Sequence, residues 1–132
     1  MKFVVDTHVL IWFLEGSSQL SREAKAILTS EKNEFILPAI VLAEAVWIVR
    51  RGKTNIPSIA FLLRAVRRDP QVSVFSLNQE VVEKSVELTA IREMHDRQIV
   101  ATALIIQAQG EEVVLLTCDR NITESNLVPI IW

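Results

Sequence analysis

Cysteine is almost missing from this sequence, since Cys118 is the only one among 132 residues. A single cysteine excludes an intramolecular disulfide framework and suits the reducing environment of the cytosol. The chain also lacks a Cys/His cluster of the kind that binds zinc. Because Cys118 follows an apolar run that is typical of a strand, we predict that its thiol is buried and inert.

Long apolar runs are missing as well. The stretch Phe35–Val49 covers 15 positions and is interrupted by Pro38 and Glu44. A membrane-spanning helix needs about 20 apolar residues. The amino-terminal residues do not resemble a signal peptide, because charged side chains interrupt what would have to be its apolar centre. The sequence therefore predicts a soluble, cytoplasmic protein without a membrane segment.

Neither sign of charge dominates. The 14 Lys and Arg residues face 16 Asp and Glu residues, so the formal net charge is -2. The total does not demand a polyanionic partner, although local basic patches remain possible. Repeats and linkers rich in Pro, Gly or Ser are also absent. Because the length suits one continuous core, we expect a single domain over residues 1–132.

What the sequence does contain is an alternation of two patterns. Short apolar runs typical of strands occur at Met1–Val5, Glu34–Leu37, Val72–Phe75, Val113–Thr117 and Val128–Ile131. Besides a helix after the first strand, helical spacing occurs at Ser21–Glu31, Pro38–Arg51, Ile56–Arg68, Asn78–Ala90 and Asp96–Gln109. Such alternation favours parallel crossovers. The predicted fold class is α/β, with three α/β/α layers around a central, mostly parallel sheet.

Several predicted helix boundaries carry typical residues. Ser21 and Asn78 are expected to cap helices, and Pro38 suits a first helical turn. Gly52 and Gly110 stand where helices should end.

Three acidic residues stand at junctions between the predicted elements. Asp6 falls between the first strand and its helix, Asp119 follows the strand near Thr117, and Asp96 opens a helix. Taken singly, each has an ordinary explanation as a helix cap, a turn residue or a partner of the helix dipole. Asp6 and Asp119, however, end strands that should be parallel. We expect them at one edge of the sheet, where open α/β sheets bind ligands.

Glu44 is the only charged residue between Glu34 and Arg50. It shares the helical stripe of Ile40, Trp47 and Ile48, which we expect to face the core. A carboxylate at or near buried surface needs a cation, or its pKa must rise until it is neutral. The alternative is a helix end that emerges into solvent beside the basic residues that follow it.

All four acids can converge, because Glu44 and Asp96 lie near the starts of helices that leave the same sheet edge. Four carboxylates in one pocket repel one another unless cations lie between them. An all-oxygen set of ligands selects hard ions such as Mg²⁺ or Mn²⁺.

The residues that carry this pattern match a family. The stretches VVDTHVLIW, AEAVWIV, HDRQIVATAL and LLTCDRN resemble PIN domains, and more narrowly the VapC-type toxin ribonucleases of prokaryotic toxin–antitoxin pairs. The resemblance covers essentially the whole chain. It implies a PIN-like fold and metal-assisted hydrolysis of an RNA phosphodiester that leaves a 5′-phosphate and a 3′-hydroxyl.

The resemblance also implies roles for individual residues. An acidic pocket that binds Mg²⁺ or Mn²⁺ would consist of Asp6, Glu44, Asp96 and Asp119, with Asp6 and Asp96 as direct ligands. Glu44 and Asp119 would bind through water or complete the shell of a second ion. Thr7 and Thr117 look like hydroxyls that orient the water of the pocket, although a cap and a strand position explain them equally well. His8 and His95 have no family role.

The implied substrate and partners extend the prediction. RNA must reach an acidic pocket, so positive side chains should flank it. The candidates are Arg50, Arg51, Lys53 and Arg97, together with Arg64, Arg67 and Arg68, and ordinary solvated charge is the alternative for each. The family further implies a homodimer and inhibition by a cognate antitoxin. Trp12, Phe13, Trp47 and Ile48 offer apolar surface for such contacts, or pack in the core.

Other functions remain open at this point. His8 and His95 would serve as acid and base in a metal-independent ribonuclease, which leaves Glu44 unexplained. Asp6 would be the nucleophile of an aspartyl phosphatase or phosphotransferase. A PIN-like module that binds RNA or protein without cleaving, and a housekeeping nuclease without an antitoxin, are further alternatives.

Overall fold

A five-stranded sheet, parallel throughout, runs through the centre of the computed structural model, which describes residues 1–132. The strands are β1 (Lys2–Val5), β2 (Glu34–Pro38), β3 (Val72–Phe75), β4 (Val113–Leu116) and β5 (Ile130–Ile131). Their order in the sheet is β3-β2-β1-β4-β5, and every neighbouring pair is parallel. All five lie at the predicted apolar runs, with small shifts at their ends.

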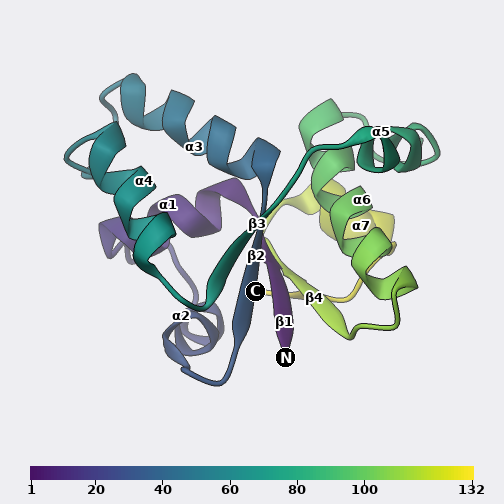
Figure 1. Ribbon diagram of the computed structural model, residues 1–132, viewed down its shortest axis with the longest axis horizontal. Coiled ribbons are helices and arrows are strands. Elements are labelled where there is room, and N and C mark those ends of the chain that lie inside the picture. Colours follow the sequence, from purple (N-terminus) through teal and green to yellow (C-terminus); the bar gives the residue numbers. More distant parts are fainter.

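Helices cover both faces of this sheet. They are α1 (Thr7–Glu15), α2 (Arg22–Thr29), α3 (Ala39–Arg50), α4 (Ile59–Arg68), α5 (Gln79–Val86), α6 (Met94–Ala108) and α7 (Arg120–Ser125). Figure 1 looks along the sheet and shows α1 to α4 on one side and α5 to α7 on the other. The predicted α/β class with three layers is confirmed.

The core lies between the sheet and its two helical layers. Val4 of β1 and Leu115 of β4 have no exposed surface, as expected for central strands that are covered on both faces. On α6, Ile99 is buried together with the small residues Ala101 and Ala103. Each fully buried aliphatic side chain of this size contributes about 1.5–3 kcal/mol to the free energy of unfolding.

Most predicted helix boundaries are confirmed. Ser21 Oγ accepts a hydrogen bond from the Ala24 N–H, and Asn78 Oδ1 accepts one from the Val81 N–H, both at 3.0 Å. Gly110 follows α6 with φ 88°, a conformation that a side chain would strain. Pro38, which we predicted within a first helical turn, instead ends β2 and stands at the N-cap position of α3.

Three helices differ from the prediction. The six-residue helix α7 was predicted only as a turn; it buries Ile122 alone, so it has too little apolar periodicity to be detected. Helix α4 begins at Ile59 because Ser58, not Ile56, caps it. Helix α5 ends at Val86, four residues earlier than predicted.

The topology fixes one edge of the sheet as a place for a ligand. From β1 the chain adds β2 and β3 on one side, and it then returns to add β4 and β5 on the other. The last residues of β1 and β4, Val5 and Leu116, are paired. Loops from neighbouring strands therefore separate at this point, which leaves a crevice at their carboxyl ends. None of the helices has the length and hydropathy to cross a membrane.

Candidate active site

Asp6 stands directly beyond the end of β1 and caps α1. Its Oδ1 accepts a hydrogen bond from the Thr7 N–H at 2.6 Å, as predicted for a helix cap. The residue is 7% exposed. Burial raises the pKa of the Asp6 carboxyl, while the hydrogen bonds from Thr117 and from the Thr7 backbone act in the opposite direction. A helix cap does not need to be buried to this extent, so capping of α1 does not by itself explain the position of Asp6.

Asp119 reaches the same edge from β4. Thr117 connects the two acids: its hydroxyl donates to Asp6 Oδ2 at 2.6 Å and accepts from the Asp119 N–H at 3.0 Å. Asp119 Oδ1 accepts from the backbone N–H groups of Asn121 and Ile122, which makes Asp119 the cap of α7. The contacts join residues 111 positions apart in the sequence. They exist because β1 and β4 are neighbours in the sheet.

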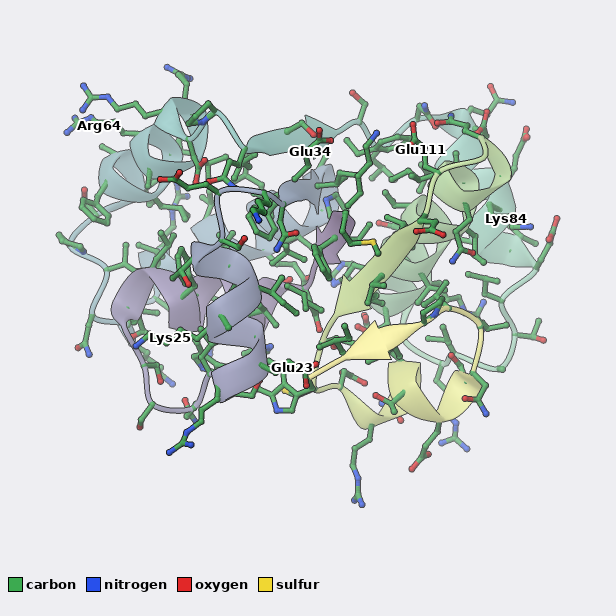
Figure 2. The ribbon with its side chains drawn as sticks, turned by 90° about the horizontal axis from the view of Figure 1, so that it is seen from below. Glu23, Lys25, Glu34, Arg64, Lys84 and Glu111 are labelled. Atoms are coloured by element: carbon green, nitrogen blue, oxygen red, sulfur yellow. The ribbon has the colours of Figure 1, made fainter.

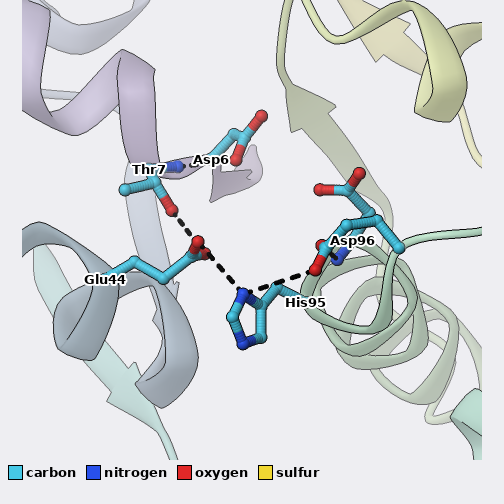
Figure 3. A network of polar contacts seen from close by, with 6 residues as sticks. Asp6, Thr7, Glu44, His95 and Asp96 are labelled. Atoms are coloured by element: carbon cyan, nitrogen blue, oxygen red, sulfur yellow. Dashed lines mark hydrogen bonds and ion pairs between the residues drawn. The ribbon is translucent and has the colours of Figure 1, made fainter.

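Glu44 approaches from α3. Its Oε1 accepts a hydrogen bond from the Thr7 hydroxyl at 3.0 Å, and the His95 Nδ1 lies 3.2 Å from its Oε2 (Figure 3). Thr7 and Thr117 were predicted to orient water in the pocket. In the structure their hydroxyl groups contact the carboxylates themselves.

The predicted orientation of α3 is wrong for Trp47, whereas Ile40 and Ile48 are partly buried against the core as expected. The side of α3 that faces the core carries Val41, Ala45 and Val49. Trp47, which we expected in the core, is 61% exposed. The helix is apolar on nearly all sides, so the sequence pattern did not distinguish the buried face from its neighbour. Glu44 lies at the border between the two faces, with 30% of its side chain exposed.

Asp96 lies in the first turn of α6, across from Glu44 (Figure 3). Burial, followed by the negative charges of Asp119, Asp6, Glu93 and Glu44, raises the pKa of Asp96 to about 7. No hydrogen-bond donor contacts its carboxylate. The cap of α6 is Glu93, which accepts from the Asp96 N–H at 2.9 Å. The other three predicted acids thus all act electrostatically on Asp96.

His95 is a residue of this region to which the family resemblance gave no role, and which the sequence connected to function only in the alternative of a metal-independent ribonuclease. Its Nδ1 contacts Glu44 on α3 and also Glu93 at 3.5 Å, so it links α3 to the start of α6. Its position directly before Asp96 in the sequence was the feature that could have indicated a role at this site. His8 instead packs against Trp12 with ring centroids 5.7 Å apart. No hydrogen bond joins the two imidazoles.

The carboxylate oxygens of the four acids are suitable ligands for a divalent cation, but their arrangement does not match a metal site. No three side chains of His, Cys, Asp or Glu stand in a ligating arrangement. Asp6, Glu44 and Asp119 are each held by hydrogen bonds from the protein. None of the four acids forms an ion pair with Lys or Arg. Their uncompensated negative charge, visible in the raised pKa of Asp96, favours a hard cation.

The predicted RNA-binding residues occupy different environments. Arg50, Arg51 and Lys53 are exposed at the end of α3. Arg97 is half-buried and its Nε donates to the Ile91 carbonyl, which fastens the segment before α6. Arg64 on α4 extends outward from the molecule (Figure 2).

The environment of Cys118 differs from the prediction. The thiol is exposed, because Cys118 follows the end of β4 and lies outside the strand. Partial burial and the charge of Asp6 raise the pKa of this thiol.

Comparison with known proteins gives a consistent picture. The family model of the PIN domain matches residues 3–125.

Solved structures are similar over nearly the whole chain. VapBC2 from Rickettsia felis, bound to a DNA fragment from its promoter, has a TM-score of 0.71 and 15% identity over 99% of this chain and 98% of that chain. VapC20 from Mycobacterium tuberculosis, described as a toxin that cleaves the sarcin–ricin loop, has a TM-score of 0.65 and 18% identity over 96% of both chains. A toxin–antitoxin complex from Klebsiella pneumoniae has a TM-score of 0.66 and 18% identity over 98% of this chain and 95% of that chain. No curated protein sequence matches the chain. At these identities the likeness shows the fold.

Proposed function

The chain belongs to the PIN-domain family, and from this membership we propose that it is a divalent-metal-dependent endoribonuclease of the cytosol. Residues 1–132 would form one PIN domain. The observation that carries the proposal is the electrostatic state of Asp96. Its carboxylate has no hydrogen-bond donor, and burial together with the charges of Asp119, Asp6, Glu93 and Glu44 raises its pKa to about 7. Such a cluster is costly to stability and is typical of a functional site.

The four acids would hold Mg²⁺, or Mn²⁺ in its place. Asp6 and Asp96 are the proposed direct ligands, while Glu44 and Asp119 would contact the ion through water or would hold a second one. A divalent ion bound there lowers the pKa of the attacking water and neutralises the charge that develops on the phosphate. No protein nucleophile is required for cleavage that leaves a 5′-phosphate and a 3′-hydroxyl.

The residues around the acids would keep this constellation in place. Thr117 fixes one oxygen of Asp6, and the Thr7 backbone fixes the other. The Thr7 hydroxyl and His95 hold Glu44 from two sides. These contacts limit the reorganisation that metal binding and catalysis require.

We further propose a toxin role for the chain, with a cognate antitoxin of the VapB type as its inhibitor and a homodimer as its working form. Support comes from the similar structures, of which several are toxin–antitoxin complexes. Trp47 on α3 and Val82 and Val86 on α5 are exposed apolar side chains that suit contact with another chain.

The ribonuclease proposal is tested with purified protein, labelled RNA and Mg²⁺. We expect cleavage that stops with EDTA, and a loss of at least about 100-fold, or about 3 kcal/mol of transition-state stabilisation, in Asp96→Asn. Glu111→Gln removes a carboxylate at the opposite edge of the sheet and should cleave like the wild type. Full activity with EDTA, or products with cyclic phosphate ends, would exclude the metal mechanism. Release of phosphate from small phosphomonoesters instead of RNA cleavage would indicate a phosphatase.

The toxin proposal needs an experiment in cells. Expression of the wild type should arrest growth, and expression of folded Asp96→Asn should not. Growth arrest by both proteins would show that toxicity does not arise from the acids. An open reading frame beside this one whose product restores growth would identify the antitoxin, and mapping RNA ends after brief induction would identify the substrate.

A further inference from the structure

A hollow lies between the end of β4, α7 and β5. Its volume is about 430 Å³, which is in the size range of small-molecule sites. The residues that line it are Thr117, Cys118, Arg120, Thr123, Glu124, Ile130 and Trp132. None of them except Thr117 has a part in the proposed acid site.

The hollow and the acid site share the residue Thr117. Thr117 is among the residues that line the hollow, and its buried hydroxyl donates to Asp6 at 2.6 Å. Cys118 lies between Thr117 and Asp119 in the sequence and opens into the same space. A molecule in the hollow therefore contacts a residue that is hydrogen-bonded to Asp6.

Aromatic side chains extend from the acids to the hollow. His8 packs against Trp12 at 5.7 Å between centroids, and Trp12 packs against Trp132 at 5.6 Å. Trp132 is half-buried, so it is held against Trp12 while it still lines the hollow. The indole ring of Trp132 thus provides a supported planar surface, which an isolated exposed tryptophan would not.

The polar groups of the hollow indicate what it binds. Arg120 supplies a cation, Thr123 supplies a hydroxyl, and Glu124 supplies a carboxylate that accepts hydrogen bonds and repels anions. A site for phosphate alone would not include Glu124. Donors, acceptors and an aromatic wall together are the features with which proteins recognise unpaired nucleobases.

We propose that this hollow binds one nucleobase of single-stranded RNA, stacked on Trp132, while the adjoining phosphodiester lies at the acids. The inference rests on the proposed ribonuclease function and assigns to that function a residue that selects the substrate. Arg120 contacts the phosphate or the base edge, and Glu124 accepts from an amino or imino group of the base. The hollow therefore favours single strands, because a paired base cannot reach Trp132.

The test measures the affinity of uncleaved RNA. In the Asp96→Asn background, binding of a fluorescein-labelled RNA decamer of random sequence is followed by anisotropy. We expect Trp132→Leu to weaken binding about 5- to 150-fold, the range for one base–aromatic stack. Trp132→Phe should restore most of the affinity. Phe61→Leu, which changes an exposed aromatic residue on α4 outside the hollow, should have no effect.

A second measurement begins from a protein in which Trp132, which also packs against the core, is unchanged. Cys118 is the only cysteine, so N-ethylmaleimide labels the wall of the hollow alone. Bound RNA should slow the labelling of Cys118 in Asp96→Asn, and it should not slow it when Trp132→Leu is added.

The outcomes separate this inference from the ribonuclease proposal. Equal RNA affinity in Trp132→Leu, or unchanged labelling of Cys118 in the presence of bound RNA, would overturn the base-binding hollow, even where the wild type cleaves RNA. Binding that depends on Trp132, combined with no cleavage by the wild type, would support the hollow and overturn the ribonuclease assignment.

Discussion

Acidic residues lie in opposite environments at the two edges of the sheet, one where the strands begin and the other where they end. Where the strands begin, Lys2 lies 3.2 Å from Glu111 and 3.9 Å from Glu34, and all three side chains contact solvent (Figure 2). Where the strands end, Asp6 is buried, and Asp96 is half-buried without a hydrogen-bond donor. No Lys or Arg pairs with the acids at this second edge.

This difference separates acids whose charge is balanced by a lysine from acids whose charge is not. Charges at the first edge are paired and solvated, so they cost little and contribute little. Charges at the second edge repel one another in a partly desolvated space, which raises the pKa of Asp96 to about 7. Such repulsion destabilises the folded chain, and it is typical of sites where a bound ligand neutralises the charges. The comparison therefore supports the proposal that the second edge holds the functional site.

The largest expected effect is the response of the second edge to metal. Mn²⁺ at 100 times its dissociation constant should add about 2.7 kcal/mol to the free energy of unfolding, because it binds only the folded acid cluster. Thermal melts with and without Mn²⁺ measure this shift. Glu34→Gln at the first edge should respond like the wild type, whereas Asp96→Asn should respond much less. An equal shift in all three proteins would contradict the difference between the edges.

The pH dependence of the metal-free protein gives a smaller effect. The native pKa of Asp96, about 7, exceeds the ordinary value of 3.8, so the folded state binds the proton more tightly. Stability should therefore fall as the pH rises from about 4 to about 7. Because Asp96 is only half-buried and water screens its charge, we expect a loss of about 1 kcal/mol.

Melting temperatures of the wild type and Asp96→Asn, measured across this pH range with EDTA, test the assignment. The amide does not titrate, so its curve should be flatter and its melting temperature at pH 8 higher than that of the wild type. Parallel curves would show that Asp96 is not the group responsible.

The smallest expected effect belongs to the first edge. Lys2→Met removes both ion pairs to Glu34 and Glu111, and the free energy of unfolding should change by less than about 1 kcal/mol. RNA cleavage should stay at the wild-type rate. Denaturant unfolding and the cleavage assay measure the two quantities. A loss of cleavage close to that of Asp96→Asn would mean that the first edge also takes part in the function.

Much of the fold follows from local patterns in the sequence. Each strand contains its own apolar run, and the caps Ser21 and Asn78 were identifiable because a cap depends on the three residues that follow it. Asp6 and Asp119 were predicted at strand ends, and both stand there as helix caps. Their role as metal ligands stays a prediction.

The errors arose where a pattern was ambiguous. Nearly every side of α3 is apolar, so periodicity did not show that Val41 faces the core and Trp47 faces outward. Cys118 was predicted as buried because it was grouped with the strand that it follows. The link between His95 and Glu44 joins two helices, and no local pattern predicts a contact of that kind.

The sequence by itself determined the succession along the chain of the five strands and of every helix except α7, the positions of Asp6 and Asp119 at strand ends, and the family. It did so because apolar periodicity, caps and motifs are local properties of the chain. Only the tertiary structure decided that Thr117 holds Asp6, that His95 holds Glu44, and that Trp132 lies against Trp12 beside the acids. Those contacts depend on which strands become neighbours and on how each helix is turned against the sheet. These are outcomes of the packing of the whole chain, since burial of the core, rather than any single segment, sets them.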